Sequence, residues 1–188
     1  MNGLNSRIAL GWRHHLWLAV LVASSLAFTF GFACAVPFAA FGAVAAITLP
    51  RRDAFLLILG LWLLNQIVGF SVLHYPWDAM TFAWGAILGA VAVASTAAGI
   101  AASERPWHPV AVIMTTFAAS FALYEGGLYL ISATVMGGIE NFEPAIVLRI
   151  LEINAAGFAG LLAAGALIGR IMPRSLAPTR PAASAPSR

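Results

Sequence analysis

Long apolar stretches separated by short polar ones make up most of this chain. Most of the stretches reach the about 20 residues that an α-helix needs to cross the hydrocarbon core of a bilayer. The pattern therefore predicts an all-α integral membrane bundle of six transmembrane helices. The six apolar runs lie at about 15–35, 36–49, 54–74, 79–102, 109–136 and 145–172. The second run, bounded by Pro37 and Pro50, is short, so it either tilts, re-enters the membrane or begins earlier, near Gly31.

The runs divide the chain into three parts. Residues 1–14 form a short polar cytoplasmic lead, 15–172 the transmembrane domain, and 173–188 a tail rich in Ala, Pro, Ser and Arg. We expect the tail to be disordered in the cytoplasm, because its composition cannot build a core. Composition agrees with a membrane protein: 61% of the 188 residues are hydrophobic and 9% are charged. A soluble domain of this size cannot hide so much apolar surface.

The basic charge is gathered in alternate connections. There is no lysine, and the arginines outside the runs precede run one, separate runs two and three and runs four and five, and follow run six. The other connections carry Asp78, Glu140 and Glu143 and no arginine. Because cytoplasmic loops carry the excess of arginine, both termini are predicted to be cytoplasmic, in a bacterial-type inner membrane. Run one and Ala33-Cys34-Ala35 imitate a cleaved lipoprotein signal, but Gly31 stands where that signal usually has leucine.

Several polar side chains lie inside the runs, where charge is costly and generally faces the bundle interior or a water-filled cavity. At a rise of about 1.5 Å per residue, those of runs three, five and six fall roughly 10 to 16 Å below the outer helix ends. We therefore expect one polar layer, made of Asn65, Glu125, Arg149 and Glu152. Arg149 and Glu152 are three positions apart and can pair, which leaves Glu125 either unpaired or sharing the same guanidinium. The layer either only fixes helix packing or forms the floor of a ligand pocket.

The second interpretation predicts a pocket open to the outer side, with Trp84, Tyr124, Phe70 and Phe32 as walls and Cys34, His74 and Asp78 at the mouth. His74 and Asp78 together suit a cation or a polar ligand edge. Tyr75 and Trp77 also fit ordinary interfacial anchors, and Asn65 a hydrogen bond between helices. The predicted substrate-binding residues are Asn65, His74, Tyr75, Trp77, Asp78, Trp84, Tyr124, Glu125, Arg149, Glu152 and Asn154.

Small residues recur at helical spacing in three runs. They are Ala19, Ala23 and Ala27 in run one, Gly85 and Gly89 in run four, and Ala156, Gly160 and Ala164 in run six. Such stripes let helices approach closely. They serve either packing within the chain or docking of a partner membrane protein.

Size, helix number, cytoplasmic termini, the Ala19-Ala23-Ala27 spacing and the outward polar pocket give residues 15–172 a family resemblance. The chain resembles the small six-helix S-components, the substrate-binding subunits of energy-coupling-factor transporters. The resemblance implies capture of a vitamin or metal ion on the outer side and an energising membrane partner. Within this group the chain is similar to the BtuM cobalamin transporter family, whose cysteine ligates the corrinoid cobalt. That implies Cys34 as the metal ligand, with His74 as the other candidate; a lone thiol is otherwise a small apolar residue.

Three functions stay open. The first is uptake of a vitamin, with cobalamin or another cobalt corrinoid as the favoured substrate, and the second is a cation- or proton-coupled permease that uses Glu125 and Glu152. The third is a scaffold or assembly subunit of a larger membrane complex. An enzyme is not expected, because the sequence shows no nucleophile–base pair, metal-ligand cluster or phosphate loop. We also expect no cofactor of its own and no nucleic-acid partner, since topology explains the arginines.

Overall fold

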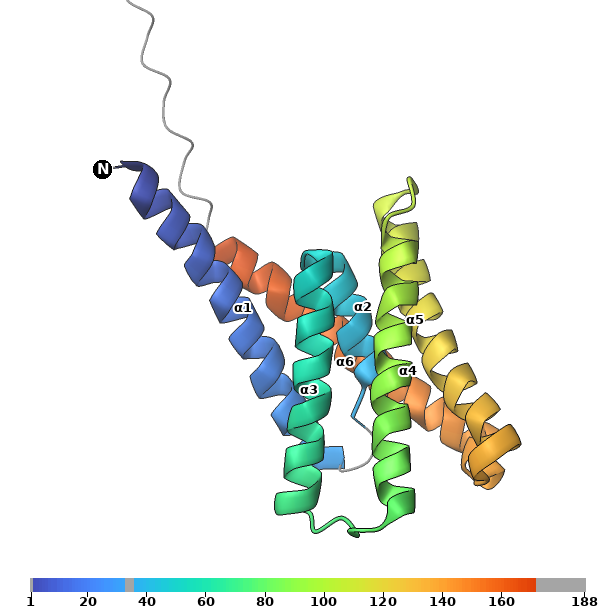
Figure 1. Ribbon diagram of the computed structural model, residues 1–188. Coiled ribbons are helices and arrows are strands. Elements are labelled where there is room, and N and C mark those ends of the chain that lie inside the picture. The colour runs from blue at the N-terminus through green and yellow to red at the C-terminus, as the bar shows by residue number, and fades with distance from the viewer. Residues whose placement is uncertain (1, 33–35, 172–188) are drawn as a thin grey trace, which may run out of the picture.

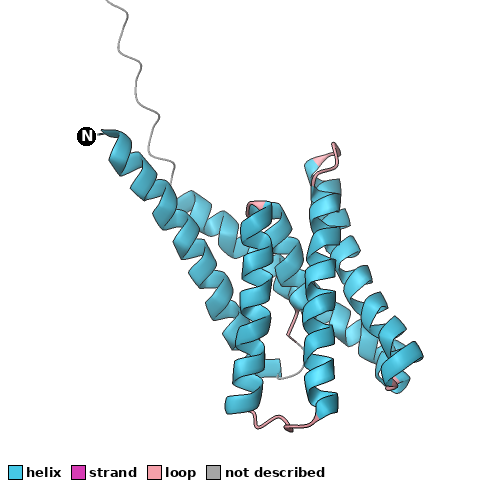
Figure 2. Ribbon diagram, in the orientation of Figure 1, coloured by secondary structure: helices cyan, strands magenta, loops and turns pink. Residues whose placement is uncertain are grey.

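The computed structural model describes residues 2–32 and 36–171, with side chains for 12–31 and 36–171. Every regular element in these ranges is a helix, which confirms the predicted all-α class (Figures 1 and 2). Cys34, the side chain of Phe32 and the predicted tail lie outside the described residues. The elements are α1 (Asn2–Phe32), α2 (Phe38–Thr48), α3 (Arg51–Ser71), α4 (Ala79–Ser103), α5 (Pro109–Ile131), the π-helical turn η1 (Ser132–Met136), the 3-10 turn η2 (Ile139–Phe142) and α6 (Pro144–Ile171).

Five helices are long and apolar enough to cross a membrane, which makes the chain a membrane protein. They are α1 over Trp12–Gly31, α3, α4, α5 continued through η1, and α6. The second predicted run forms α2, which has only 11 residues. At about 1.5 Å per residue it covers roughly half of a bilayer core. The predicted set of six transmembrane helices thus consists of five candidate spans and one shorter helix.

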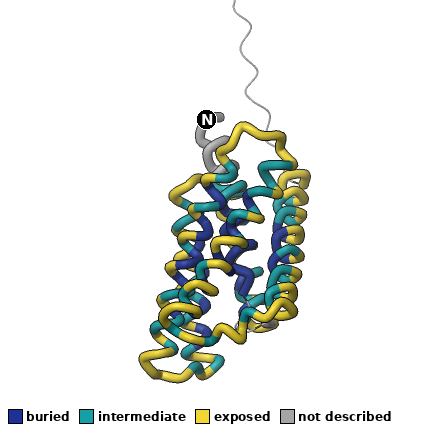
Figure 3. Tube along the Cα trace, turned by 90° about the vertical axis from the view of Figure 1, so that its right-hand side faces the viewer, coloured by how far each residue is buried: buried dark blue, intermediate teal, exposed yellow. Residues whose placement is uncertain are grey.

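The short helix α2 forms the centre of the bundle. All residues from Phe38 to Ala45 are buried, and the helix contacts α3, α4, α5 and α6. A helix that is apolar on every side has no face for water and is stable only when surrounded. Figure 3 shows the buried positions running through the middle of the molecule, with exposed ones around them. Gly42 lets α4 come close, because a Cβ there would lie 2.7 Å from Thr96 Oγ1.

The described connections alternate between the two ends of the bundle (Figure 1). The α2–α3 turn, the α4–α5 loop and the start of α1 lie at one end, while the α3–α4 loop and the η1–η2 segment lie at the other. Arg51, Arg52 and Arg105 are therefore collected at the first end, and Asp78 and Glu140 at the second. This segregation suits the predicted topology with cytoplasmic termini, whose orientation stays a prediction.

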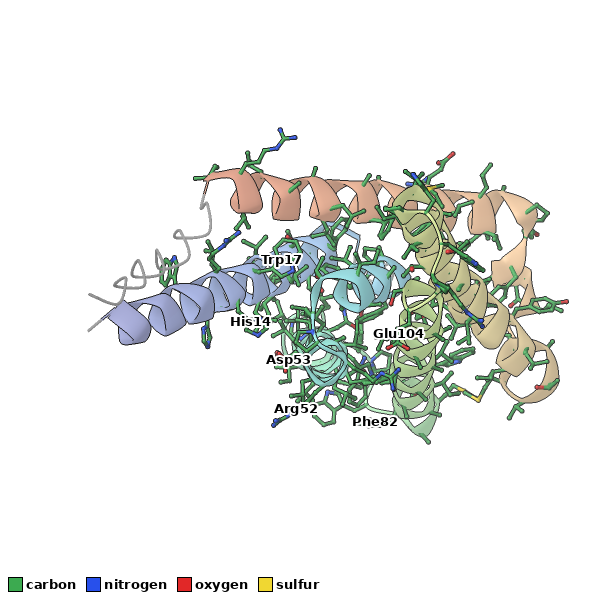
Figure 4. All side chains as sticks on the ribbon, turned by 90° about the horizontal axis from the view of Figure 1, so that it is seen from above. His14, Trp17, Arg52, Asp53, Phe82 and Glu104 are labelled. Atoms are coloured by element: carbon green, nitrogen blue, oxygen red, sulfur yellow. The ribbon has the colours of Figure 1, made fainter. Side chains whose placement is uncertain are left out.

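Polar contacts connect the helices at the arginine-rich end. Arg51 Nη2 donates to both carboxylate oxygens of Glu104, at 2.8 and 2.9 Å, and so joins α3 to α4. His14 Nε2 lies 3.2 Å from Asp53 Oδ2, and Trp17 Nε1 donates to Thr48 Oγ1 at 3.0 Å (Figure 4). These contacts fix which helix ends are neighbours, but exposed ion pairs contribute little to stability.

The three small-residue stripes differ in their surroundings. In α4, Gly85 and Gly89 pack inside the chain: Trp62 Nε1 donates to the Gly85 carbonyl at 2.8 Å, and a Cβ on Gly89 would lie 2.6 Å from the Trp62 ring. The prediction of packing within the chain is wrong for Ala19, Ala23 and Ala27, because all three residues are exposed. The inward face of α1 is instead formed by Trp17, Leu21, Ser25 and Thr29.

In α6 the stripe is split between two faces. Ala164 packs against the core, whereas Ala156 and Gly160 are exposed. The prediction of packing within the chain is therefore wrong for Ala156 and Gly160. Nothing lies within 4 Å of a Cβ added at Gly160. The residues that α6 buries are Asn154, Gly157, Phe158 and Leu161.

Candidate functional site

A half-open cavity of about 300 Å³ lies among α2, α3, α4 and α5, below the α3–α4 loop. Its deepest lining residues, Phe38, Asn65 and Tyr124, are buried, while Pro76 and Met80 are exposed. The exposure of the lining therefore increases toward the loop, which places the mouth at that end. The full lining is Phe38, Asn65, Gln66, Tyr75, Pro76, Met80, Thr81, Trp84, Gly85, Leu88 and Tyr124.

Four of the residues predicted to form the pocket line this cavity. Asn65, Tyr75, Trp84 and Tyr124 come together there from three helices and one loop. Asn65 uses its Nδ2 to donate a long hydrogen bond, 3.4 Å, to Thr29 Oγ1 on α1. The Tyr124 ring packs 6.3 Å from the ring of Phe38, measured between centroids. Amide groups and aromatic faces thus share one concave surface, which is typical of small-molecule sites.

The loop after α3 folds one aromatic ring back over that helix. Three residues after the end of α3, His74 has φ of 55°, a left-handed conformation, and the Tyr75 amide then donates to the Gly69 carbonyl at 3.0 Å. The Tyr75 ring consequently lies directly on Gly69, where any Cβ would overlap it. His74 itself is exposed and does not line the cavity. Its predicted place at the mouth is therefore corrected: it shapes the turn that positions Tyr75.

Asp78 and Trp77 also have local roles in this loop. Asp78 Oδ1 accepts a hydrogen bond from the Thr81 amide at 2.8 Å, so it caps the N-terminus of α4. Trp77 is 77% exposed and lies 5.2 Å from the Phe70 ring, which stacks on Phe82 at 4.8 Å. Neither Trp77, Asp78 nor Phe70 lines the cavity. The prediction that Phe70 is a cavity wall is wrong, because its ring belongs to an aromatic cluster on the outside of α3 and α4.

Glu125 is buried but lies beside the cavity rather than in its lining. Its Oε2 has no hydrogen-bond partner within the described part of the chain. Three hydroxyls of the same helix and turn share this property, those of Thr116, Ser120 and Ser132. Buried polar atoms are generally hydrogen-bonded, so these four atoms, spread along α5 and η1, are exceptions to that rule.

Asn154 connects α6 to the start of α2 and so has a structural role. Its Oδ1 accepts a hydrogen bond from the Ala40 amide at 3.1 Å, at the otherwise uncapped N-terminus of α2, and its Nδ2 donates to the Ile150 carbonyl at 3.0 Å. An amide that satisfies a buried helix end is a packing contact. Asn154 does not line the cavity, which corrects its predicted position in the pocket.

The prediction of one polar layer fails for Arg149 and Glu152. Both side chains are exposed on α6, line a shallow depression of that helix alone, and form no ion pair with each other or with any other described residue. Glu125 therefore does not share the Arg149 guanidinium. The physical reason is that position along a helix sets depth, but rotation about its axis decides the direction in which a side chain points.

No group of three or more His, Cys, Asp or Glu side chains gathers anywhere in the described ranges. The predicted cobalt ligand Cys34 lies outside those ranges. The predicted substrate-binding residues left out several residues of the lining, among them Phe38, Gln66 and Thr81. Gln66 adjoins Asn65 and had a readable signal, an amide in the middle of an apolar run. Phe38 had none, because a phenylalanine within an apolar run does not show which helix it will face.

Comparison of the chain with protein-family models, curated proteins and solved structures found no match. The resemblance to S-components and to the BtuM family consequently stays a prediction, carried by architecture and by the residues quoted for it.

Proposed function

We propose that the chain is a membrane-embedded binding protein for uptake of a small organic solute of vitamin size. The observation that carries this proposal is the half-open cavity of about 300 Å³, in which the buried amide of Asn65 and several aromatic side chains share the lining. Apolar walls with a few polar groups suit a flat, partly aromatic ligand with one hydrogen-bonding edge. The proposal assigns the chain no catalytic reaction and no resident cofactor.

The segregation of arginines at one end supports an orientation with cytoplasmic termini in a bacterial-type inner membrane. In that orientation the mouth of the cavity opens to the outer side, where an uptake protein meets its solute. The exposed Ala19-Ala23-Ala27 stripe on α1 supports docking of an energising membrane partner, as the S-component resemblance implies.

A cobalt corrinoid remains the substrate that the resemblance favours, but a corrinoid is several times larger than the cavity. Only one edge of such a ligand fits, so its metal would need a ligand from a residue that does not line the cavity. The candidates are Cys34, which the resemblance implies, and His74, which is exposed in the α3–α4 loop. Equilibrium binding of cobalamin to the wild type, Cys34→Ala and His74→Ala tests this version. Absence of binding by all three rejects the corrinoid and leaves the smaller solute as the substrate class.

The test of the broader proposal is binding of a panel of small water-soluble vitamins to the purified full chain in nanodiscs, followed by tryptophan fluorescence. We expect one saturable ligand, with Gln66→Leu or Trp84→Leu weakening its Kd about tenfold, the equivalent of one lost hydrogen bond or ring contact. Trp107→Leu is the matched control, because Trp107 is exposed in the α4–α5 loop. Equal affinities in all three variants, or no ligand in the panel, would refute the proposal.

A second candidate, a cation- or proton-coupled permease, is favoured by the unpaired Oε2 of buried Glu125. Since Glu152 is exposed on α6, this version depends on Glu125 alone. Glu125→Gln keeps the size of the side chain and removes its charge. If the chain is a coupled permease, Glu125→Gln proteoliposomes lose pH-driven solute or ion flux, while Glu140→Gln, in an exposed turn, retains it. Unchanged flux in Glu125→Gln would leave simple binding as the better description.

A further inference from the structure

One side of α6 carries no covering element within the described chain. Its exposed positions recur every three or four residues, while the buried ones lie on the opposite side, against α2 and its neighbours. Figure 4 shows α6 along one edge of the molecule. We call this surface the α6 outer face; it is formed by Ala145, Arg149, Glu152, Ala156, Gly160 and Ala163.

The α6 outer face contains two opposite charges within a candidate membrane span, Pro144–Ile171. Arg149 and Glu152 are exposed and form no hydrogen bond or ion pair with any residue that the structure describes. Ionisable side chains inside membranes rarely face lipid, and they pair with one another or with backbone groups. Neither charge has such a partner among the residues that the structure describes.

We propose that the α6 outer face is the contact surface of a homodimer in which Arg149 of each copy pairs with Glu152 of the other. Two copies inserted in the same direction are related by a two-fold axis along the membrane normal, so the same surface meets itself. The two residues differ by three positions, about 4.5 Å along the helix. An arginine side chain spans that offset.

The charge pattern favours a second copy over other occupants. A partner with a single charge, such as a lipid phosphate, would satisfy Arg149 and leave Glu152 facing hydrocarbon. The reciprocal arrangement forms two Arg149–Glu152 ion pairs, so that each of the four charges has one partner of opposite sign. Ala145 and Ala156 lie one turn before Arg149 and one turn after Glu152, and their small side chains allow the two backbones to approach where the helices cross.

The test uses the full chain in nanodiscs, with native mass spectrometry to measure the dimer fraction and two different tags to identify mixed dimers. We expect the wild type to be dimeric, and Arg149→Glu and Glu152→Arg each to lose dimers at least tenfold. Mixing these two variants should restore dimers, because each contact across the interface then joins one Arg to one Glu. A role of the charges within one chain predicts no such rescue.

Two further variants keep the test decisive if a charge reversal prevents folding. Arg149→Leu/Glu152→Leu suits lipid and should be folded and monomeric, while the double exchange Arg149→Glu/Glu152→Arg should dimerise. Arg105→Glu, in the exposed α4–α5 loop, is the matched control and should dimerise like the wild type. A monomeric wild type, dimers that persist in the double leucine variant, or absence of rescue on mixing would each overturn the proposal. So would a different protein or a lipid bound at this face in place of a second copy.

Discussion

Asp78 shows how one side chain fixes the start of α4, the helix that supplies five of the eleven residues lining the cavity. Its carboxylate accepts a hydrogen bond from the Thr81 amide at 2.8 Å, and Thr81 lines the cavity within the first turn of α4. An aspartate in this loop also suits a cation site, which was predicted from Asp78 together with His74. The two roles differ in their tolerance of an amide, because asparagine caps a helix as well as aspartate does but binds cations less strongly.

We therefore predict that Asp78→Ala lowers the free energy of unfolding by about 1 kcal/mol, the typical value of an N-cap, while Asp78→Asn leaves it nearly unchanged. Thermal unfolding of the purified protein in detergent measures both. An equal loss of stability in the two variants, or a loss that added divalent cations reverse, would show that the negative charge and not the cap is what matters.

His74 is the residue whose type and conformation disagree most. Residues with φ near 55° are usually glycine, because a Cβ is disfavoured there, or asparagine, whose short polar side chain can hydrogen-bond locally. In this chain the turn brings the Tyr75 ring onto Gly69 and thereby closes one wall of the cavity. The sequence displayed the histidine as a ligand candidate, but only the backbone geometry shows its part in the turn.

At the scale of elements, the same spacing of small residues leads to opposite surroundings in different helices. Side chains of α3 occupy the space beside Gly85 and Gly89, whereas Ala19, Ala23 and Ala27 are exposed. The difference arises because α1 offers two faces, and the one with Trp17 and Leu21 buries more apolar area. Small residues therefore mark surfaces that allow close approach, without fixing which surface the chain itself uses.

The short helix α2 is the element on which the others depend. Its buried residues contact four other helices, and Asn154 of α6 caps its N-terminus. Run length alone predicted that this segment was too short for a straight span. Its central place follows from its composition, since alanine and glycine let neighbouring helices pack on every side.

At the scale of the whole molecule, the collection of the loop arginines at one end of the bundle predicts the orientation. We predict that a membrane-impermeant maleimide applied to intact cells labels Glu140→Cys, at the acidic end, and not Arg105→Cys, at the arginine-rich end. Both variants are made in a Cys34→Ser background, and both positions are exposed. Detergent permeabilisation is the control that makes Arg105→Cys reactive. Labelling of Arg105→Cys alone in intact cells would reverse the orientation and place the cavity mouth in the cytoplasm.

The sequence by itself determined the helical class, the order of the helices, the short second helix and the order of the polar residues along each helix. These properties depend on hydropathy and on the rise per residue, which are local and nearly constant. Asn65, Tyr75, Trp84 and Tyr124 were found in this way, because each was a polar or aromatic residue near the predicted depth of the pocket.

Only the tertiary structure decided which way each helix is turned. Arg149 and Glu152 have the predicted order along α6 but point away from Glu125, and Asn154 on the same helix points inward to α2. A rotation of α6 about its own axis changes none of the properties that the sequence displays, yet it exchanges the buried and exposed faces. That rotation is fixed by contacts between residues far apart in the chain, such as Asn154 with Ala40.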